Sequence, residues 1–391
     1  MTLKQQEIIL NQERKVRLSV MIQAVGGGAF PELHKRPGVL ILPGGGYSMC
    51  SNREAEMVAY PYLQAGYHAF VLRYSVGKHN AWPNPLNDYE QAMELIYSHA
   101  EEWNVLTEKM ALIGFSAGGH LAACAATMSK YRPQAAILGY AALSRESADM
   151  CQPGMPVPGE HVDEKTCPMF LFATRDDNII PVQDTVDFEK ALIGYGIMFE
   201  SHIYAFGQHG FSTGVEHLNA GSLCSRTKHW VSDSIEWLQD VLGVLQTNGM
   251  AQPVCLGKIN GDWEEMLSVD CTVGHLKKQG GQAQQVVRET LFVLDAAAAE
   301  MTGNNTIIET VYGKMKLRDL MVMTGQPQAD IVRLDEDLKK IVNSRDSKAI
   351  EKQQRDLKIA EDLGKIRNSR VNGDKTYSVD ELDAFLADAI K

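Results

Sequence analysis

The sequence predicts a doubly wound α/β fold, in which helices cover both faces of a mostly parallel sheet, with an appended mainly helical C-terminal part. Two observations support this prediction. In the first 250 residues, short apolar runs alternate with segments of helical pattern, as expected for buried strands joined by crossover helices. After residue 250, charged residues become denser and aromatic residues and prolines become scarce, which is typical of helices with solvated faces.

The expected strands are short, apolar and bounded by turn residues. They lie at 17–22, 38–42, 68–73, 110–115, 135–139, 169–174 and 200–204, with helices at 54–65, 85–103, 183–194 and 227–242. In the C-terminal part, helices are expected at 262–276, 282–301, 317–323, 334–343, 348–366 and 378–390. A polar stretch that ends at Pro253 favours a boundary between two domains, residues 1–247 and residues 248–391.

Composition excludes several classes of protein. The chain has 391 residues and 45% hydrophobic residues, which fits a globular protein of two domains. Its net charge of -11 argues against nucleic acid or an anionic membrane as partner. Residues 1–7 lack the apolar core of a secretory signal, and the seven cysteines contain no Cys-x-x-Cys pair. These features predict a cytoplasmic protein with reduced thiols and no membrane span.

The pattern Gly-x-Ser-x-Gly at residues 114–118 indicates a catalytic serine. An apolar strand precedes it and a run of helix-forming residues, 119–126, follows it. A sharp turn from strand to helix exposes the hydroxyl of Ser116 above the sheet, as a nucleophile requires. The alternative is a tight turn in which Ser116 only caps the helix. His120, one helical turn later, is expected to be a packed or capping residue.

A serine nucleophile needs a histidine to accept its proton and a carboxylate to orient that histidine. In a sheet of this type, the acid and then the histidine should follow the serine along the chain. Asp177, just after the strand at 169–174, is the preferred acid, and Asp176 is its competitor. An Asx turn or helix cap is the non-catalytic alternative for these aspartates. His209, between two glycines after the last strand, is the expected base.

A glycine run follows the strand at 38–42 and is expected to form an oxyanion hole. Glycine lets backbone N–H groups approach a developing negative oxygen closely. Gly45 and Gly46 are the expected donors from this loop, and the N–H of Ala117 supplies a third. A phosphate-binding turn is the alternative, but the run lacks the Lys-Ser/Thr of a P-loop and the spacing of a dinucleotide site. No metal or cofactor is expected.

Four segments resemble a known family. They read PGGGY at 43–47, SNREAE at 51–56, GYHAFVLRYS at 66–75 and GFSAGGH at 114–120. Together they resemble bacterial α/β-hydrolases related to carbohydrate acetyl esterases, often called acetyl, acetylxylan or feruloyl-like esterases, over residues 15–245. The resemblance implies an α/β-hydrolase fold with Ser116, Asp177 and His209 as catalytic triad. Pro43 stands where many relatives have histidine, which favours the acetyl-esterase branch over lipase-like or formamidase branches.

The sequence therefore predicts a serine carboxylesterase that removes small acyl groups, acetyl above all, from xylan- or mannan-type oligosaccharides through an acyl-enzyme. Two other functions are carried as alternatives. One is a serine peptidase or amidase on the same fold, and the other is a non-catalytic binding protein that uses its C-terminal helices. Residues 248–391 are open to three roles: a homo-oligomer contact, a lid over the active site, or a module that binds another protein.

Overall fold

The structure is a computed structural model that describes residues 2–27, 31–219, 221–279, 283, 285–288, 290, 292 and 312–344. Its contacts divide the chain into two compact units, one ending at Ile259 and the other beginning at Asn260. Within the described residues, no helix is both long enough and apolar enough to cross a membrane. The cytoplasmic location stays a prediction.

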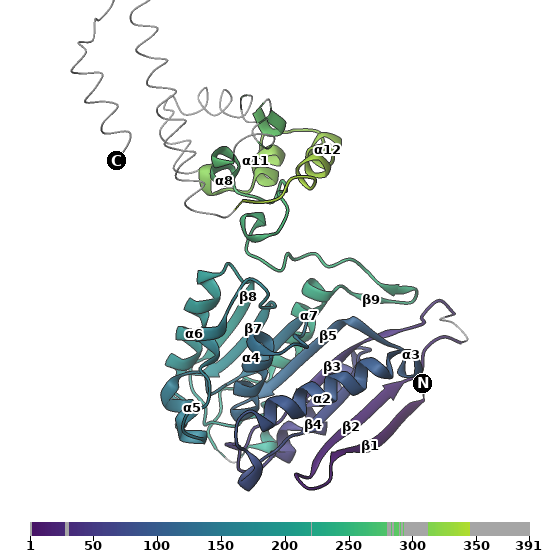
Figure 1. Cartoon of the computed structure of the whole chain (residues 1–391), viewed down its shortest axis with the longest axis vertical. Helices are drawn as coiled ribbons and strands as arrows, with labels where there is room; N and C mark the ends of the chain where they lie inside the picture. Colours follow the sequence, from purple (N-terminus) through teal and green to yellow (C-terminus); the bar gives the residue numbers. More distant parts are fainter. Residues whose placement is uncertain are drawn as a thin grey trace, which may run out of the picture. The chain divides into compact units, whose positions relative to one another are not determined.

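An eight-stranded sheet forms the first unit, in the order β1-β2-β4-β3-β5-β6-β7-β8 (Figure 1). The strands from β4 to β8 are all parallel, whereas β1 and β2 are antiparallel to their neighbours. This mostly parallel sheet confirms the predicted fold class. The bounds are β1 Leu3–Asn11, β2 Val16–Gln23, β3 Arg36–Leu42, β4 His68–Arg73, β5 Val105–Phe115, β6 Ala135–Gly139, β7 Met169–Thr174 and β8 Phe199–Tyr204.

Strand β1 is the element of this sheet that the sequence did not predict. Its residues are LKQQEIILN, and most of them are exposed at the edge of the sheet. A strand needs a continuous apolar run only where both of its faces are covered, and β1 is largely exposed on both. The other seven strands overlap the segments predicted as strands, although β8, at the opposite edge, reads FESHIY and carries no apolar run.

Helices cover both faces of the sheet, because alternate residues of the central strands point to opposite sides. Leu40 and Leu42 of β3 belong to one core cluster, and Val39 and Ile41 belong to the other. The first cluster includes residues of α2, α4 and α6, and the second includes residues of α1 and α7. The bounds are α1 Glu56–Gln64, α2 Asn84–Ser98, α3 Ala100–Trp103, α4 Ala117–Met128, α5 Arg145–Cys151, α6 Val182–Gly194 and α7 His229–Leu242.

Residues after α7 continue to contact the first unit. Strands β9, Leu245–Gln246, and β10, Gly249–Met250, form a short hairpin. Further on, Lys258 forms a β-bridge with Ile197, and its ammonium group donates to the carbonyl of Glu164 at 2.8 Å. The backbone N–H of Ile259 donates to the carbonyl of Gly196. The first unit is therefore tied together up to Ile259.

The described part of the second unit contains helices around a small apolar core of its own. They are α8 Val273–Lys278, α11 Leu317–Met323 and α12 Gln328–Leu338, with 3-10 turns at Gly261–Trp263 and Tyr312–Lys314. The expected helix at 317–323 is confirmed. Of the expected helix at 282–301, only residues 283, 285–288, 290 and 292 are described, and they are helical. The expected helices at 348–366 and 378–390 lie outside the described residues.

Two helices in the second unit have bounds that differ from expectation. The helix expected at 262–276 begins only at Val273, because the Asp262 carboxylate accepts hydrogen bonds from both the N–H and the hydroxyl of Thr272 and holds a loop. Thr272 then caps the helix by accepting from the N–H of His275. The helix expected at 334–343 begins earlier, at Gln328 after Pro327, and ends at Leu338.

Candidate functional site

Ser116 lies on the sharp turn between β5 and α4, with a backbone φ of 52° and ψ of -119°. This conformation is unusual for a residue other than glycine. Its neighbour Gly118 has no room for a side chain, because a Cβ there would lie 2.2 Å from the carbonyl oxygen of Leu42. The Gly-x-Ser-x-Gly pattern thus permits a turn that packs directly against the end of β3. It presents Ser116 at the carboxyl edge of the parallel strands.

The side chains of Ser116, His209 and Asp177 form two hydrogen bonds in series, a hydrogen-bonded relay. The Nε2 atom of His209 is 2.8 Å from the Oγ of Ser116, and its Nδ1 atom is 2.8 Å from Oδ2 of Asp177. The Asp177 side chain is fully buried, and the His209 side chain is 11% exposed. With an N–H at Nδ1, the histidine donates to the carboxylate and has Nε2 available to accept the serine proton.

The other oxygen of Asp177 is held by the backbone. Oδ1 accepts hydrogen bonds from the N–H groups of Ile179 and Ile180, each at 2.9 Å. The next residue, Asn178, accepts the backbone N–H of His209 on its side-chain oxygen at 3.1 Å. The turn after β7 therefore fixes both the carboxylate and the start of the loop that carries the imidazole.

The three N–H groups expected in the oxyanion hole follow the carboxyl ends of β3 and β5, which are neighbouring parallel strands. Gly45 and Gly46 follow β3, and Ala117 is the first residue of α4. Neither Gly45 nor Gly46 donates its N–H to another group within the described residues. The N–H of Ala117 is in the first helical turn, where the backbone offers no acceptor. Donors without a partner suit a site that receives negative charge.

His120 is a buried structural residue, as expected from the sequence. Its Nδ1 accepts from the hydroxyl of Tyr47 at 2.8 Å, and its Nε2 donates to the carbonyl of Pro156 at 2.8 Å. Burial lowers the pKa of His120 to about 4, so the ring is neutral near pH 7. The contact with Tyr47, which directly follows the glycine run, supports the far end of that loop.

Sequence reasoning missed two buried polar residues beside the relay, Glu54 and Tyr140. Glu54 is 3% exposed and Tyr140 is 1% exposed. The Tyr140 ring lies edge-to-face against the His209 ring, with 5.0 Å between the ring centroids. Tyr140 directly follows the end of β6, which is the edge of the sheet where Ser116 and Asp177 lie. A polar residue directly after a parallel strand is a candidate site residue, and this sequence position could have identified Tyr140.

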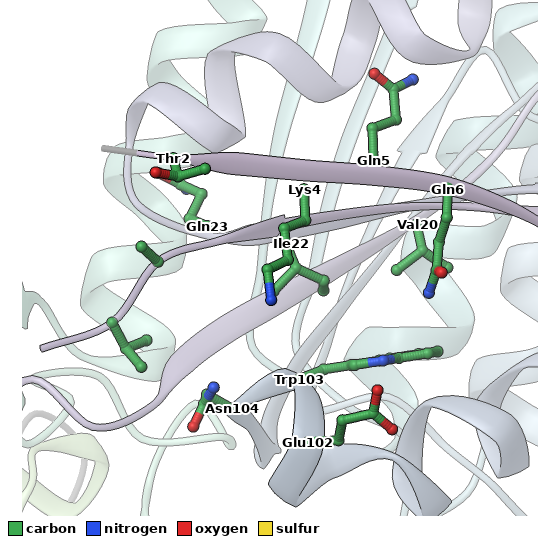
Figure 2. Close-up of a pocket in the computed structure, with 12 residues that line it drawn as sticks. Thr2, Lys4, Gln5, Gln6, Val20, Ile22, Gln23, Glu102, Trp103 and Asn104 are labelled. Carbon is green, nitrogen blue, oxygen red and sulfur yellow. The ribbon is translucent and has the colours of Figure 1, made fainter.

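A separate cavity of about 460 Å³ lies at the opposite edge of the sheet (Figure 2). It is bordered by the first residues of β1, the last residues of β2 and the end of α3, including Gln6, Ile22 and Trp103. None of the predicted site residues lines it. Within the described residues, no group of three or more His, Cys, Asp or Glu side chains is arranged to hold a metal ion.

Comparisons with known proteins agree with this fold. The BD-FAE family pattern matches residues 8–134. An acetylxylan esterase of Xylanibacter ruminicola is 30% identical over 206 residues, which are 47% of this chain and 43% of that protein. Endo-1,4-beta-xylanase B of Butyrivibrio fibrisolvens is 28% identical over 217 residues, which are 48% of this chain and 34% of that protein. The chain thus spans less than half the length of these curated relatives.

Two solved structures cover the first unit more completely. The α/β hydrolase MGS-M1, from a Medee basin deep-sea metagenome library, is 39% identical with a TM-score of 0.57, and the match covers 61% of this chain and 98% of that one. An acetyl ester-xyloside bifunctional hydrolase of Caldicellulosiruptor lactoaceticus is 25% identical with a TM-score of 0.52, over 61% and 97% of the two chains. The chain therefore belongs to the α/β-hydrolase family, and its residues 8–134 match the BD-FAE pattern.

Proposed function

We propose that this protein is a serine carboxylesterase that hydrolyses small acyl esters, acetyl esters above all. The observation that carries this proposal is the relay in which His209 lies 2.8 Å from both the Ser116 hydroxyl and the Asp177 carboxylate. Residues 1–247 form the proposed catalytic domain. Relatives named as esterases and ester hydrolases support the same reaction class.

The reaction proceeds in two steps. Oγ of Ser116 attacks the ester carbonyl while Nε2 of His209 takes its proton, and the N–H groups of Gly45, Gly46 and Ala117 stabilise the oxyanion. The imidazolium then gives that proton to the leaving alcohol, which leaves Ser116 acylated. Water, deprotonated by His209, attacks the acyl-enzyme and releases the acid. Asp177 keeps the imidazole in the required tautomer and stabilises its charged form.

The proposed substrates are acetylated xylan- or mannan-type oligosaccharides. The xylan-type part of this choice is supported by the names of two matched proteins, an acetylxylan esterase and an acetyl ester-xyloside hydrolase. A homo-oligomer contact through the C-terminal helices also remains a proposal.

An activity panel on the full chain tests both the proposed reaction, ester hydrolysis, and the proposed substrates, acetylated oligosaccharides. It contains p-nitrophenyl esters of increasing acyl length, acetylated xylo- and manno-oligosaccharides, and a peptide anilide, each with the wild type and Ser116→Ala. We expect turnover of the acetate ester and release of acetate from the oligosaccharides, both lost in the variant. Turnover of the anilide in preference to the esters would indicate a peptidase or amidase. Failure of Ser116 to react with a fluorophosphonate probe would indicate a non-catalytic protein.

A further inference from the structure

Glu54 is a buried carboxylate whose two oxygens bind two different loops of the site. It is 3% exposed. Oε2 accepts the backbone N–H of Gly44 at 2.9 Å, and Oε1 accepts the hydroxyl of Tyr140 at 2.6 Å. Burying a carboxyl group is costly unless its oxygens form hydrogen bonds, and in Glu54 each oxygen has one.

The Oε1 side of Glu54 leads to the loop that carries His209. The backbone N–H of Ser212 donates to the Tyr140 oxygen at 2.9 Å, so the single hydroxyl proton of Tyr140 is directed to Glu54. The Ser212 hydroxyl donates to the carbonyl of Arg53, the residue before Glu54. Ser212 lies three positions after His209, and the Tyr140 ring packs against the imidazole. This chain of hydrogen bonds therefore connects the loop that carries His209 to Glu54 and Arg53.

The Oε2 side leads to the glycine loop and to the nucleophile. A Cβ placed on Gly44 would lie 2.7 Å from Oε2 of Glu54 and 3.0 Å from Cβ of Ser116. The carboxylate and the serine thus border the same small space on either side of Gly44. Because Gly44 donates its N–H to Glu54, its peptide is fixed, and the next two N–H groups in the chain, those of Gly45 and Gly46, are oriented by it.

We propose that Glu54 is a positioning residue. Through its bonds to Gly44 and Tyr140, it fixes the position of the glycine loop relative to the loop that carries His209. This inference rests on the proposed function. The glycine loop supplies the proposed oxyanion donors, and the histidine loop supplies the base. These loops follow β3 and β8, and Glu54 links them through its bonds to Gly44 and Tyr140. A small displacement of either loop lengthens a reacting distance, which costs turnover more than binding.

Tyr140→Phe and Glu54→Gln, alone and combined, test the proposal in the full-length protein. Phenylalanine removes only the link to the histidine loop. Glutamine keeps the shape but offers a single acceptor oxygen, so one of the two donors loses its acceptor. The matched control is Tyr62→Phe. Tyr62 is equally buried in the same core cluster, but its hydroxyl bonds to Ser234 Oγ at 2.7 Å, away from the relay.

We expect kcat on p-nitrophenyl acetate to fall about 10- to 100-fold in Tyr140→Phe and Glu54→Gln, with KM changed by less than about threefold. Tyr62→Phe should lower the thermal midpoint as Tyr140→Phe does but leave kcat near that of the wild type. In the double variant, kcat should fall by a factor far smaller than the product of the two single-variant factors, because both residues act in one chain of hydrogen bonds. Equal kcat values in Tyr140→Phe and Tyr62→Phe would overturn the proposal. A double variant whose fold-loss in kcat equals the product of the two single-variant losses would also overturn it.

A second measurement separates this proposal from the proposed function. The Nδ1 proton of His209, bonded to Asp177, should give a downfield resonance in the proton NMR spectrum that disappears in His209→Gln. We expect this resonance in the wild type and in Tyr62→Phe, and its broadening by solvent exchange in Tyr140→Phe and Glu54→Gln. This result would support the positioning role even if no ester were turned over. An unchanged resonance in Glu54→Gln would refute the role whatever the activity.

Discussion

The adjacent aspartates Asp176 and Asp177 face different partners. Oδ2 of Asp177 lies 2.8 Å from Nδ1 of His209, whereas Oδ1 of Asp176 accepts the backbone N–H of Gly207 at 2.7 Å. One carboxylate orients the imidazole, and the other holds the beginning of the loop on which that imidazole sits. The competition between the two aspartates, which the sequence left open, thus has a geometric answer in favour of Asp177 as the proposed triad acid.

We expect Asp177→Asn to lower kcat by about 10²- to 10⁴-fold, because an amide cannot hold the imidazole in the tautomer that the reaction needs. Asp176→Asn is the matched control. Asparagine keeps an oxygen that can accept the N–H of Gly207, so its kcat should stay close to that of the wild type. Steady-state kinetics on p-nitrophenyl acetate measure both. A larger loss in Asp176→Asn than in Asp177→Asn would transfer the role to Asp176.

Ser116→Ala should leave the fold intact and lower kcat by about 10⁴-fold or more, since the oxyanion donors alone give a small part of the rate. The variant should also fail to react with a fluorophosphonate probe, and its circular dichroism should match the wild type. Ser98→Ala, which removes an exposed hydroxyl on α2, is the control. Near-normal kcat in Ser116→Ala would show that another group is the nucleophile.

Two buried histidines should make the protein less stable in mild acid. Burial lowers the pKa of both His68 and His120 to about 4, from an ordinary value of 6.5. The native state keeps these rings neutral, while the unfolded state takes up their protons below pH 6.5. Their contribution to stability is therefore complete above pH 6.5 and is lost as the pH falls toward 4. At pH 5 each should have lowered the free energy of unfolding by about 2 kcal/mol.

Urea unfolding at pH 7.5, 6 and 5 measures this effect. His120→Gln should reduce the loss of stability between pH 7.5 and 5 by about 2 kcal/mol, because glutamine can bond to Tyr47 and Pro156 without titrating. Ser98→Ala, which removes an exposed hydroxyl that does not titrate in this range, should leave the pH dependence unchanged. The same pH dependence in His120→Gln as in the wild type would show that His120 is not a neutral buried group in the native protein.

A chain that ends at Ile259 should fold and cleave p-nitrophenyl acetate with kcat and KM close to those of the full chain. Both large core clusters and all the proposed triad residues lie before this point. Ending the chain at Gln246 instead should lower the thermal midpoint, because it removes the bonds that Lys258 and Ile259 make to the first unit. If the protein that ends at Ile259 is folded by circular dichroism but inactive, the second unit supplies part of the site.

The sequence by itself determined the central sheet and the order of the site residues along the chain. A buried parallel strand needs a continuous apolar run, and the elbow at Ser116 needs glycine nearby, so both leave local patterns that can be read directly. Strand β1 left no such pattern, because an edge strand is mostly exposed. Asp262 likewise delayed the start of α8 through a bond to Thr272, ten positions away.

The tertiary structure alone decided which polar side chains meet. The division of work between Asp176 and Asp177 depends on where two loops from different strands lie, and not on any local preference of the dipeptide. Glu54 belongs to a charged segment that would ordinarily face water, yet it is buried against Tyr140, 86 positions further along the chain. A hydrogen bond between residues so far apart in the sequence depends on the packing of the whole sheet, so no short stretch of sequence predicts it.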